Sequence, residues 1–162
     1  MRGPELLLVF VAIFFVVLAA ESVIVGLASQ HSTPSAVSVN PPMTVLYSEF
    51  DGSTTNFDAM NNEQLKSIAG LTLENTNYGK IVVGPMVDLT VDAVGNVVDI
   101  DSGVEISSNS VVINGALLSS LNKAGVIYLY GLSFSNPRVV RNGAVCAECI
   151  RLSYNGGTMA FI

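Results

Sequence analysis

The sequence has few of the side chains that carry catalysis, metal binding or nucleic-acid recognition. His31 is its single histidine, it has two cysteines, and tryptophan is absent. With so few nitrogen and sulfur ligands, a His-based catalytic triad or a four-ligand zinc site is not expected. Lysine and arginine number 7 against 13 acidic residues, for a net charge of −6. A nucleic-acid partner is therefore not expected, because binding phosphates requires a basic face.

Charged residues are scarce as well, at 12% of the chain, whereas apolar residues make up 50%. Disordered chains have the opposite balance, so the chain is expected to fold. The charges are unevenly placed: ten acidic residues lie between Glu49 and Glu105, and the balance turns basic from Lys123 onward. The two halves could pair within one copy or head to tail between copies, although solvated faces are the ordinary explanation.

Residues 1–30 form an apolar leader, which predicts a signal peptide or a membrane anchor helix. No polar side chain occurs from Leu6 to Ala20, and the apolar character resumes after Glu21, from Val23 to Ala28. A cleaved signal peptide needs only a short apolar run before small residues, whereas an anchor needs about 20 apolar residues. Arg2 is the only basic residue before Lys66. The N-terminus is therefore expected to stay in the cytoplasm and the remainder to lie outside.

The beginning of the leader supports a third alternative. Glu5 directly precedes the apolar run, which resembles the start of type IV pilins, including the archaeal ones. That resemblance implies that Glu5 aligns subunits in a filament core. The sequence departs from the processing site of this family, because Pro4 follows Arg2 and Gly3.

Two further regions follow the leader. Residues 31–43 are rich in Ser, Thr and Pro, which predicts an extended stalk. Residues 44–162 are predicted to form an extracellular β domain, truncated at its C-terminus if the protein continues beyond Ile162. One helix is predicted over Asp58–Ala69, with Asn61 or Asn62 as its cap and Gly70 as its end. Strands are predicted over 44–50, 71–74, 80–83, 87–91, 97–100, 104–107, 111–113, 126–132, 138–141, 149–154 and 158–162.

The fold class is predicted to be mainly β, preceded by the one N-terminal hydrophobic helix. Apolar strands starting near Lys80, Val104 and Val126 recur at about the length of one solenoid coil, and Asn109 and Asn114 suit its corners. This favours a short parallel β-solenoid-like stack with terminal hairpins. The hairpins are predicted around Asn142-Gly143 and around Asn155-Gly156-Gly157. The alternative is an antiparallel β-sandwich.

Several segments of the sequence resemble segments of one family. They are Glu49 to Phe57, Leu71 to Glu74, Tyr78 to Ile81, Val98 to Asp101, Val104 to Ser107, and Leu121 to Arg138. Together they resemble a β-rich domain at the N-terminal side of large predicted cell-surface proteins of small-genome archaea. The resemblance implies a surface location and a chain that continues beyond Ile162. It also implies a cysteine pair after the Pro-Arg stretch, although Cys146 and Cys149 lie closer together here than in that group.

Cys146 and Cys149 are the only pair with a functional spacing. A redox pair would need a helix N-terminus after a strand, and a zinc site would need two more ligands. Neither requirement is met by the predicted β-hairpin around them. A small disulfide in an oxidising compartment is the favoured interpretation.

Two weaker sites are also considered. Asp88, Asp92, Asp99 and Asp101 are candidate calcium ligands, because hard oxygen donors can bind this ion; no other cofactor is expected. Tyr128 and Tyr130 alternate along one predicted strand, so they share a face and form a possible binding platform, although cross-strand packing is the ordinary explanation.

The function predicted from the sequence is a non-enzymatic structural or adhesion module at the cell surface or outside the cell. Its expected partners are the membrane, through the N-terminal segment, and surface proteins or glycans. One alternative is a secreted polysaccharide-active enzyme on a β-solenoid, with Asp99 or Asp101 in its acidic patch. The other is a pilin-like filament subunit.

Overall fold

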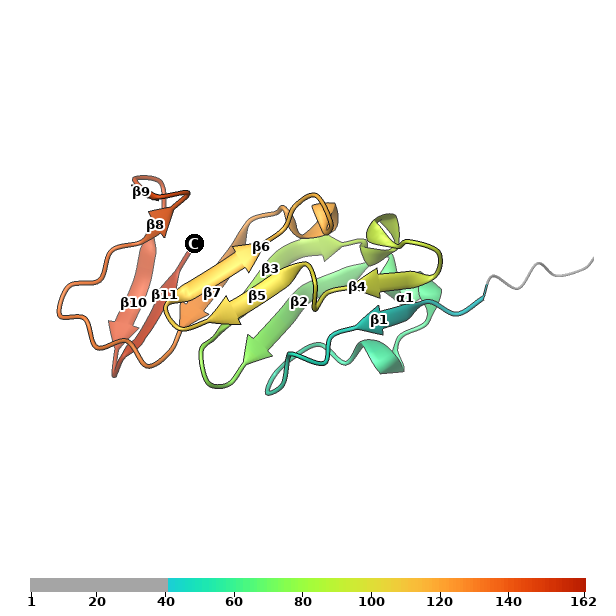
Figure 1. The fold of residues 1–162 in the computed structure, drawn as a ribbon, viewed down its shortest axis with the longest axis horizontal. Coiled ribbons are helices and arrows are strands. Elements are labelled where there is room, and N and C mark those ends of the chain that lie inside the picture. Colours follow the sequence, from blue (N-terminus) through green and yellow to red (C-terminus); the bar gives the residue numbers. More distant parts are fainter. Residues whose placement is uncertain (1–40) are drawn as a thin grey trace, which may run out of the picture. The chain divides into compact units, whose positions relative to one another are not determined.

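The computed structural model describes residues 41–162, so the leader (1–30) and most of the stalk (31–43) lie outside the described residues. The predicted N-terminal helix lies there too. The described part is mainly β, as the sequence predicted (Figure 1). Within residues 41–162 no helix has both the length and the apolar character needed to cross a membrane.

A five-stranded antiparallel sheet is the centre of the fold, with the strand order β10-β11-β7-β3-β2. Its strands are β2 (Ile68–Asn75), β3 (Gly79–Val87), β7 (Gly125–Leu129), β10 (Arg151–Asn155) and β11 (Thr158–Phe161). The shorter strands are β1 (Thr44–Leu46), β4 (Val97–Asp99), β5 (Val104–Ser107), β6 (Ser110–Ile113), β8 (Val140–Arg141) and β9 (Ala144–Val145). The helices are α1 (Asn62–Leu65) and the 3-10 helices Phe57–Ala59, Leu89–Asp92 and Ser119–Leu121.

The main sheet buries one face because its strands alternate in polarity. Leu71 and Leu73 of β2 are fully buried, whereas Thr72 and Glu74, which alternate with them, lie half-buried on the other face. The short strands cover the buried face and add apolar side chains to the same core. These side chains are Val45, Val98, Ile100, Val104 and Ile106.

A second, smaller cluster extends the core toward the C-terminus. It consists of Leu129, Leu132, Met159 and Phe161. Val111 and Ile127 contact both clusters, so the buried face is continuous across the sheet.

The predicted parallel solenoid is wrong. The strands that were expected to stack in successive coils, β3 and β7, instead pair directly with each other in antiparallel register. β5 turns back on β6, and Asn109 adopts a positive φ of 60° in that reversal rather than at a solenoid corner. In the described residues the parallel pairing is confined to β1 and β4. The antiparallel alternative therefore has the right strand direction, because spacing along the chain reports where strands occur but not which neighbour each one chooses.

The predicted helix over Asp58–Ala69 is mostly wrong. Asn61 does cap α1, since its side chain accepts from the amide of Gln64 and the Gln64 side chain accepts from the amide of Asn61. The helix ends at Leu65, however, and β2 begins at Ile68. Leu65 and Ile68 have a helix-like spacing, but Leu65 lies in a single helical turn and Ile68 begins an extended strand.

The predicted strand over 87–91 is also wrong beyond its first residue. Val87 ends β3, and Asp88 then accepts hydrogen bonds from the amide and the hydroxyl of Thr90. This local capping begins the 3-10 helix Leu89–Asp92, because an aspartate side chain competes with strand pairing for the backbone donors.

Both predicted terminal hairpins are confirmed. Asn142 and Gly143 have positive φ values of 52° and 81° in the turn between β8 and β9. The hairpin is shorter than expected, since Tyr154 pairs with Met159 in the next hairpin, β10–β11. The turn of that second hairpin is Asn155-Gly156-Gly157, as predicted.

The two edges of the main sheet differ. Along β2, the amides of Asp51 and Thr55 donate to the carbonyls of Glu74 and Thr72 at 2.7 and 2.9 Å. In return, the amides of Glu74 and Thr72 donate to the hydroxyls of Thr54 and Thr55. The preceding loop thus covers the β2 edge. β10 forms the other edge and pairs only with β11 among the strands of the described part.

Candidate functional site

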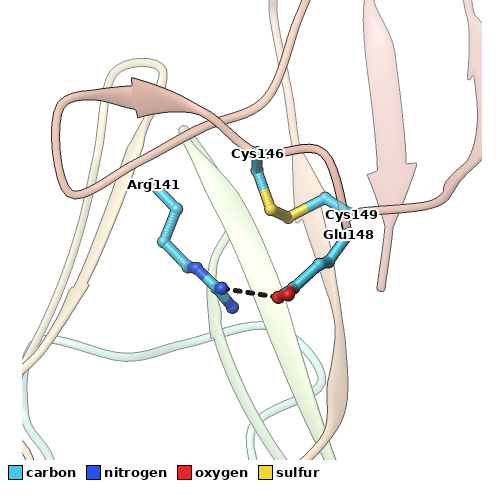
Figure 2. Close-up of a disulfide and its surroundings, with 4 residues drawn as sticks. All are labelled: Arg141, Cys146, Glu148 and Cys149. Carbon is cyan, nitrogen blue, oxygen red and sulfur yellow. Dashed lines mark hydrogen bonds and ion pairs between the residues drawn. A yellow bond between two sulfur atoms is a disulfide. The ribbon is translucent and has the colours of Figure 1, made fainter.

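Cys146 and Cys149 form a disulfide in the loop between β9 and β10, which confirms the favoured prediction (Figure 2). Their Cα atoms are 5.4 Å apart. The amide of Cys146 donates to the carbonyl of Val139 at 2.9 Å, so the loop is tied to the start of the β8–β9 hairpin. No helix follows Cys146 in this part of the chain, and the arrangement therefore lacks the helix N-terminus of a redox pair.

An ion pair lies beside the disulfide. Arg141 of β8 points toward Glu148, whose carboxylate is 2.8 Å from its guanidinium (Figure 2). Both side chains are largely exposed, at 63% and 81%. An exposed pair of this kind adds little stability, so the covalent bond is the main local constraint on this loop.

The four aspartates proposed as calcium ligands bind four separate groups of donors. Each carboxylate accepts hydrogen bonds from a different group of donors: Asp88 from Thr90, Asp92 from Ser119 and Ser120, Asp99 from Ser102, and Asp101 from Ser48 and Glu49. Among residues 41–162 no three acidic, histidine or cysteine side chains are grouped as metal ligands. Calcium binding stays a prediction, without a cluster to support it in this region.

Asp99 and Asp101 alternate with the buried residues Val98 and Ile100, so the two aspartates share the outward-facing side of this segment, as expected. β4 ends at Asp99, however, and Asp101 belongs to the following turn. Hydrogen bonds from the side chain and the amide of Ser102 lower the pKa of Asp99. Both carboxylates thus stabilise turns of the backbone rather than converging on one point.

Tyr128 and Tyr130 share the face of the sheet opposite the core, where both are half-buried. Lys80 lies over the ring of Tyr128, with its Nζ atom 5.0 Å from the ring centroid. The hydroxyl of Tyr130 donates to Oε1 of Glu74 at 2.7 Å. In the structure, the two tyrosines of the predicted platform therefore contact Lys80 of β3 and Glu74 of β2.

Glu74 connects this platform to the loop that covers the β2 edge. Its Oε2 accepts from the amide of Ser53 at 2.5 Å while its Oε1 accepts from Tyr130. The hydrogen bond from Ser53 is the main cause that lowers the pKa of Glu74, with further help from Tyr130 and Lys80. Burial and the Glu74 carboxylate raise the pKa of Tyr130. No pattern in the sequence pointed to Glu74, because its partners come from distant segments.

An open acidic cavity of about 530 Å³ lies between the loop after β1, the end of β2, the turn after β4 and the β5–β6 hairpin. Its polar lining consists of the side chains Glu49, Asn75, Asp101, Ser102, Glu105 and Asn114. Phe50 and Val112 add apolar walls. Carboxylates and amides accept hydrogen bonds, so the cavity suits ligands rich in donors, such as sugar hydroxyls or ammonium groups. No local sequence signal could have revealed it, since its lining comes from four separate segments.

The comparisons with known proteins give no family. No family model and no curated protein matches the sequence. Two crystal structures are similar in fold over 65% of this chain. One is a mutant of the Chaetomium thermophilum Nup145N APD fused to Nup145C N, with 21% identity, a TM-score of 0.43 and 84% of that chain covered. The other is the C-terminal domain of the nuclear pore complex component NUP116 from Candida glabrata, with 19% identity, a TM-score of 0.40 and 81% covered. These values are too low to assign a family or a function.

Proposed function

We propose that this protein is a non-enzymatic structural or adhesion module displayed outside the cell membrane. The apolar leader over 1–30 directs the chain to the membrane, and the Ser/Pro-rich stalk over 31–43 separates the β domain from it. The domain itself is mainly β, and the net charge of the chain is −6, which does not favour a nucleic-acid partner.

The observation that carries this proposal is the Cys146–Cys149 disulfide. The bond lies in an exposed loop, flanked by the exposed side chains of Ala147 and Glu148. Disulfides persist in oxidising compartments outside the cytosol, whereas cytosolic thiols are kept reduced. An accessible disulfide therefore supports a domain that works outside the cell.

The two alternatives receive less support. The polysaccharide-active enzyme was linked to a β-solenoid, and residues 41–162 form an antiparallel sheet instead. Asp99 and Asp101, its candidate acids, are each bound to a separate backbone turn. The filament hypothesis depends on Glu5 and the apolar segment after it, which lie outside the described residues.

Display outside the cell can be tested with the full chain produced in a host that exports membrane proteins. Intact cells are treated with a protease or with a membrane-impermeant biotin reagent, and a cytoplasmic protein serves as the control for lysis. The β domain should be labelled or cleaved while the control stays protected. Protection of the domain in intact cells, with labelling after lysis, would show that the protein is not exported.

The intact mass of the recovered protein completes this experiment. A mass that includes residues 1–28 identifies an anchored protein, and loss of this segment identifies a secreted one. Loss of residues 1–3 alone would favour the filament alternative. An adhesive role further predicts that cells displaying the protein gain binding to glycan-coated or protein-coated surfaces, whereas a purely structural role predicts no such gain.

A further inference from the structure

The C-terminal end of the domain combines exposed apolar side chains with positive charge. We call this region the basic end, defined by the exposed side chains Phe134, Arg138, Val140, Arg141, Val145, Ile150, Arg151 and Leu152. The region contains three arginines, whereas the segment from 123 onward contains one acidic residue, Glu148. It also contains a hollow of about 230 Å³, whose apolar lining is Leu129, Leu132, Phe134, Pro137 and Met159 and whose polar lining is Asn109, Asn136 and Arg138.

A second group of exposed apolar side chains is surrounded by negative charge. We call this region the acidic end, defined by Leu46, Asp88, Val91, Asp92, Val94, Val97 and Asp99. Val94 is 85% exposed, and it pairs with Val97 in an isolated bridge beside β4. The β1–β4 pairing places Leu46 opposite Asp99. Protruding valines and aspartates thus lie close together on this end.

The two ends do not neutralise each other within one copy. Among the described residues the ion pairs are Lys66 with Glu63 and Arg141 with Glu148, and both are local in the sequence. Arg138 and Arg151 have no carboxylate within ion-pair distance in residues 41–162. The charges of Arg138 and Arg151 are therefore not neutralised by ion pairs within residues 41–162.

The topology separates the two ends. β10 is the edge strand of the main sheet, and the β8–β9 hairpin precedes it, whereas β1 and β4 pair outside this sheet. Figure 1 shows β8, β9 and β10 at one side of residues 41–162 and the β1–β4 pair at the other. One molecule thus presents a hollow with arginines on one side and protruding valines with aspartates on the opposite side.

We infer that the domain associates head to tail, with the acidic end of one copy docking on the basic end of a second copy. Contact between two basic ends would bring arginines together, and contact between two acidic ends would bring aspartates together. Opposite ends combine unlike charges and bury apolar surface on both partners. Such a contact leaves one free basic end and one free acidic end, so it can repeat into open chains.

The chemistry of the contact predicts its salt dependence. Burial of Val91 and Val94 in the basic end, near the hollow, supplies the attraction, while the charges orient the partners and speed their encounter. Hydrogen bonds from Ser102 lower the pKa of Asp99, so this carboxylate stays ionised at neutral pH. Charges at a contact between exposed surfaces are screened by salt, and the association should weaken as the salt concentration rises.

The inference goes beyond surface display, because it holds wherever the folded domain is located. It is tested with the full chain in detergent micelles by sedimentation velocity, over a range of protein concentrations at low and at high salt. Any association through the apolar leader is present in every variant, so the effects of charge changes report on the β domain alone.

Two variants change the ends separately. In the first, Arg138→Glu and Arg151→Glu are combined, and in the second, Val91→Lys and Val94→Lys are combined. All four side chains are exposed, so both variants should fold. Each alone should weaken self-association by about tenfold or more, since like charges then meet in the contact. Val112→Lys is the control, because Val112 is exposed on β6 and belongs to neither end.

Mixing the two variants gives the decisive result. The lysines of one variant face the glutamates of the other, and the unchanged acidic and basic ends of the two variants also meet, so the mixture should associate again into open chains in which the two variants alternate. Salt-independent behaviour of the unmodified chain, equal association of all variants, or failure of the mixture to associate would overturn the inference. A closed symmetric dimer that survives both sets of changes would overturn it as well, and so would a chain whose β domain stays monomeric at low salt.

Discussion

Tyr130 and Glu74, 56 positions apart in the sequence, are joined by a hydrogen bond of 2.7 Å from the tyrosine hydroxyl to the carboxylate. Glu74 in turn accepts from the amide of Ser53, in the loop that covers the β2 edge. This pair therefore links strand β7, strand β2 and the covering loop across the outer face of the sheet.

Replacing Tyr130 by Phe removes the donor and keeps the ring. We expect the free energy of unfolding to fall by about 1 kcal/mol, because the bond to the carboxylate is partly solvated. Urea denaturation measures the change. Tyr78→Phe is the matched control, since the hydroxyl of exposed Tyr78 makes no hydrogen bond with the described residues. Equal stability of the two variants would contradict the assigned role of Tyr130.

The raised pKa of Tyr130 predicts a loss of stability in alkaline solution. Its pKa is raised in the folded state by burial and then by Glu74, so its contribution is fully present below the unfolded pKa of about 10. The contribution is lost as the pH rises from there toward the folded pKa. Stability measured above pH 10 should fall less steeply in Tyr130→Phe than in the unmodified chain. If the stability of the two proteins fell with the same slope above pH 10, the pKa of Tyr130 would not be raised in the folded state.

The lowered pKa of Glu74 predicts the opposite dependence in acid. The amide of Ser53 stabilises the ionised carboxylate, so the contribution of Glu74 is present above its unfolded pKa of about 4.3. It is lost as the pH falls through the lower folded pKa. Glu74→Gln should therefore be less stable than the unmodified chain at pH 7, and this difference should shrink below pH 4. A difference that is constant with pH would contradict the prediction; Glu63→Gln, on the exposed surface of α1, is the control.

Reduction of the Cys146–Cys149 disulfide should loosen the loop before β10 without unfolding the domain. The closed loop is very short, so its loss should cost at most about 2 kcal/mol. Hydrogen exchange should become faster at the amides of Cys146 and Ile150, which donate to Val139 and Ile162. The amides of Leu71 and Leu73 in β2 provide the internal reference. Unchanged exchange near the cysteines would show that the disulfide does not constrain this loop.

Gly79 is required where β3 approaches β7. A Cβ atom at this position would clash with the carbonyl oxygen of Tyr128. Gly79→Ala should therefore lower the free energy of unfolding by about 3 kcal/mol or more, because backbone must move to relieve the clash. Gly115→Ala is the control, since no atom lies within 4 Å of its added Cβ, and its effect should stay within about 0.5 kcal/mol.

Local features of this fold were predictable from the sequence, while the choice of strand partners was not. The turns at Asn142-Gly143 and Asn155-Gly156-Gly157 were correct because these residues tolerate positive φ by themselves. The spacing of Lys80, Val104 and Val126 was correctly interpreted as strands and wrongly as a parallel stack. Spacing carries no information on strand direction, which depends on contacts formed across the whole domain.

Among the candidate sites, too, those formed by neighbouring residues were predictable and those formed by distant residues were not. Cys146 and Cys149 are three positions apart, and this spacing, without a helix N-terminus or further metal ligands nearby in the sequence, favoured the disulfide that the structure contains. The acidic cavity and the link between Glu74 and Tyr130 were not predictable, because their residues are brought together from separate segments. The four aspartates show the converse: their density in the sequence suggested one site, and in the structure each accepts hydrogen bonds from a different group of donors.

The sequence by itself determined what depends on neighbouring residues: the positions of most strands, their buried and exposed sides, the glycine and asparagine turns, and the disulfide. Only the tertiary structure decided the antiparallel strand order, the cover over the β2 edge, the acidic cavity and the separation of charge between the two ends. Those features depend on which distant segments pack together, and that choice minimises the free energy of the whole domain rather than of any one segment.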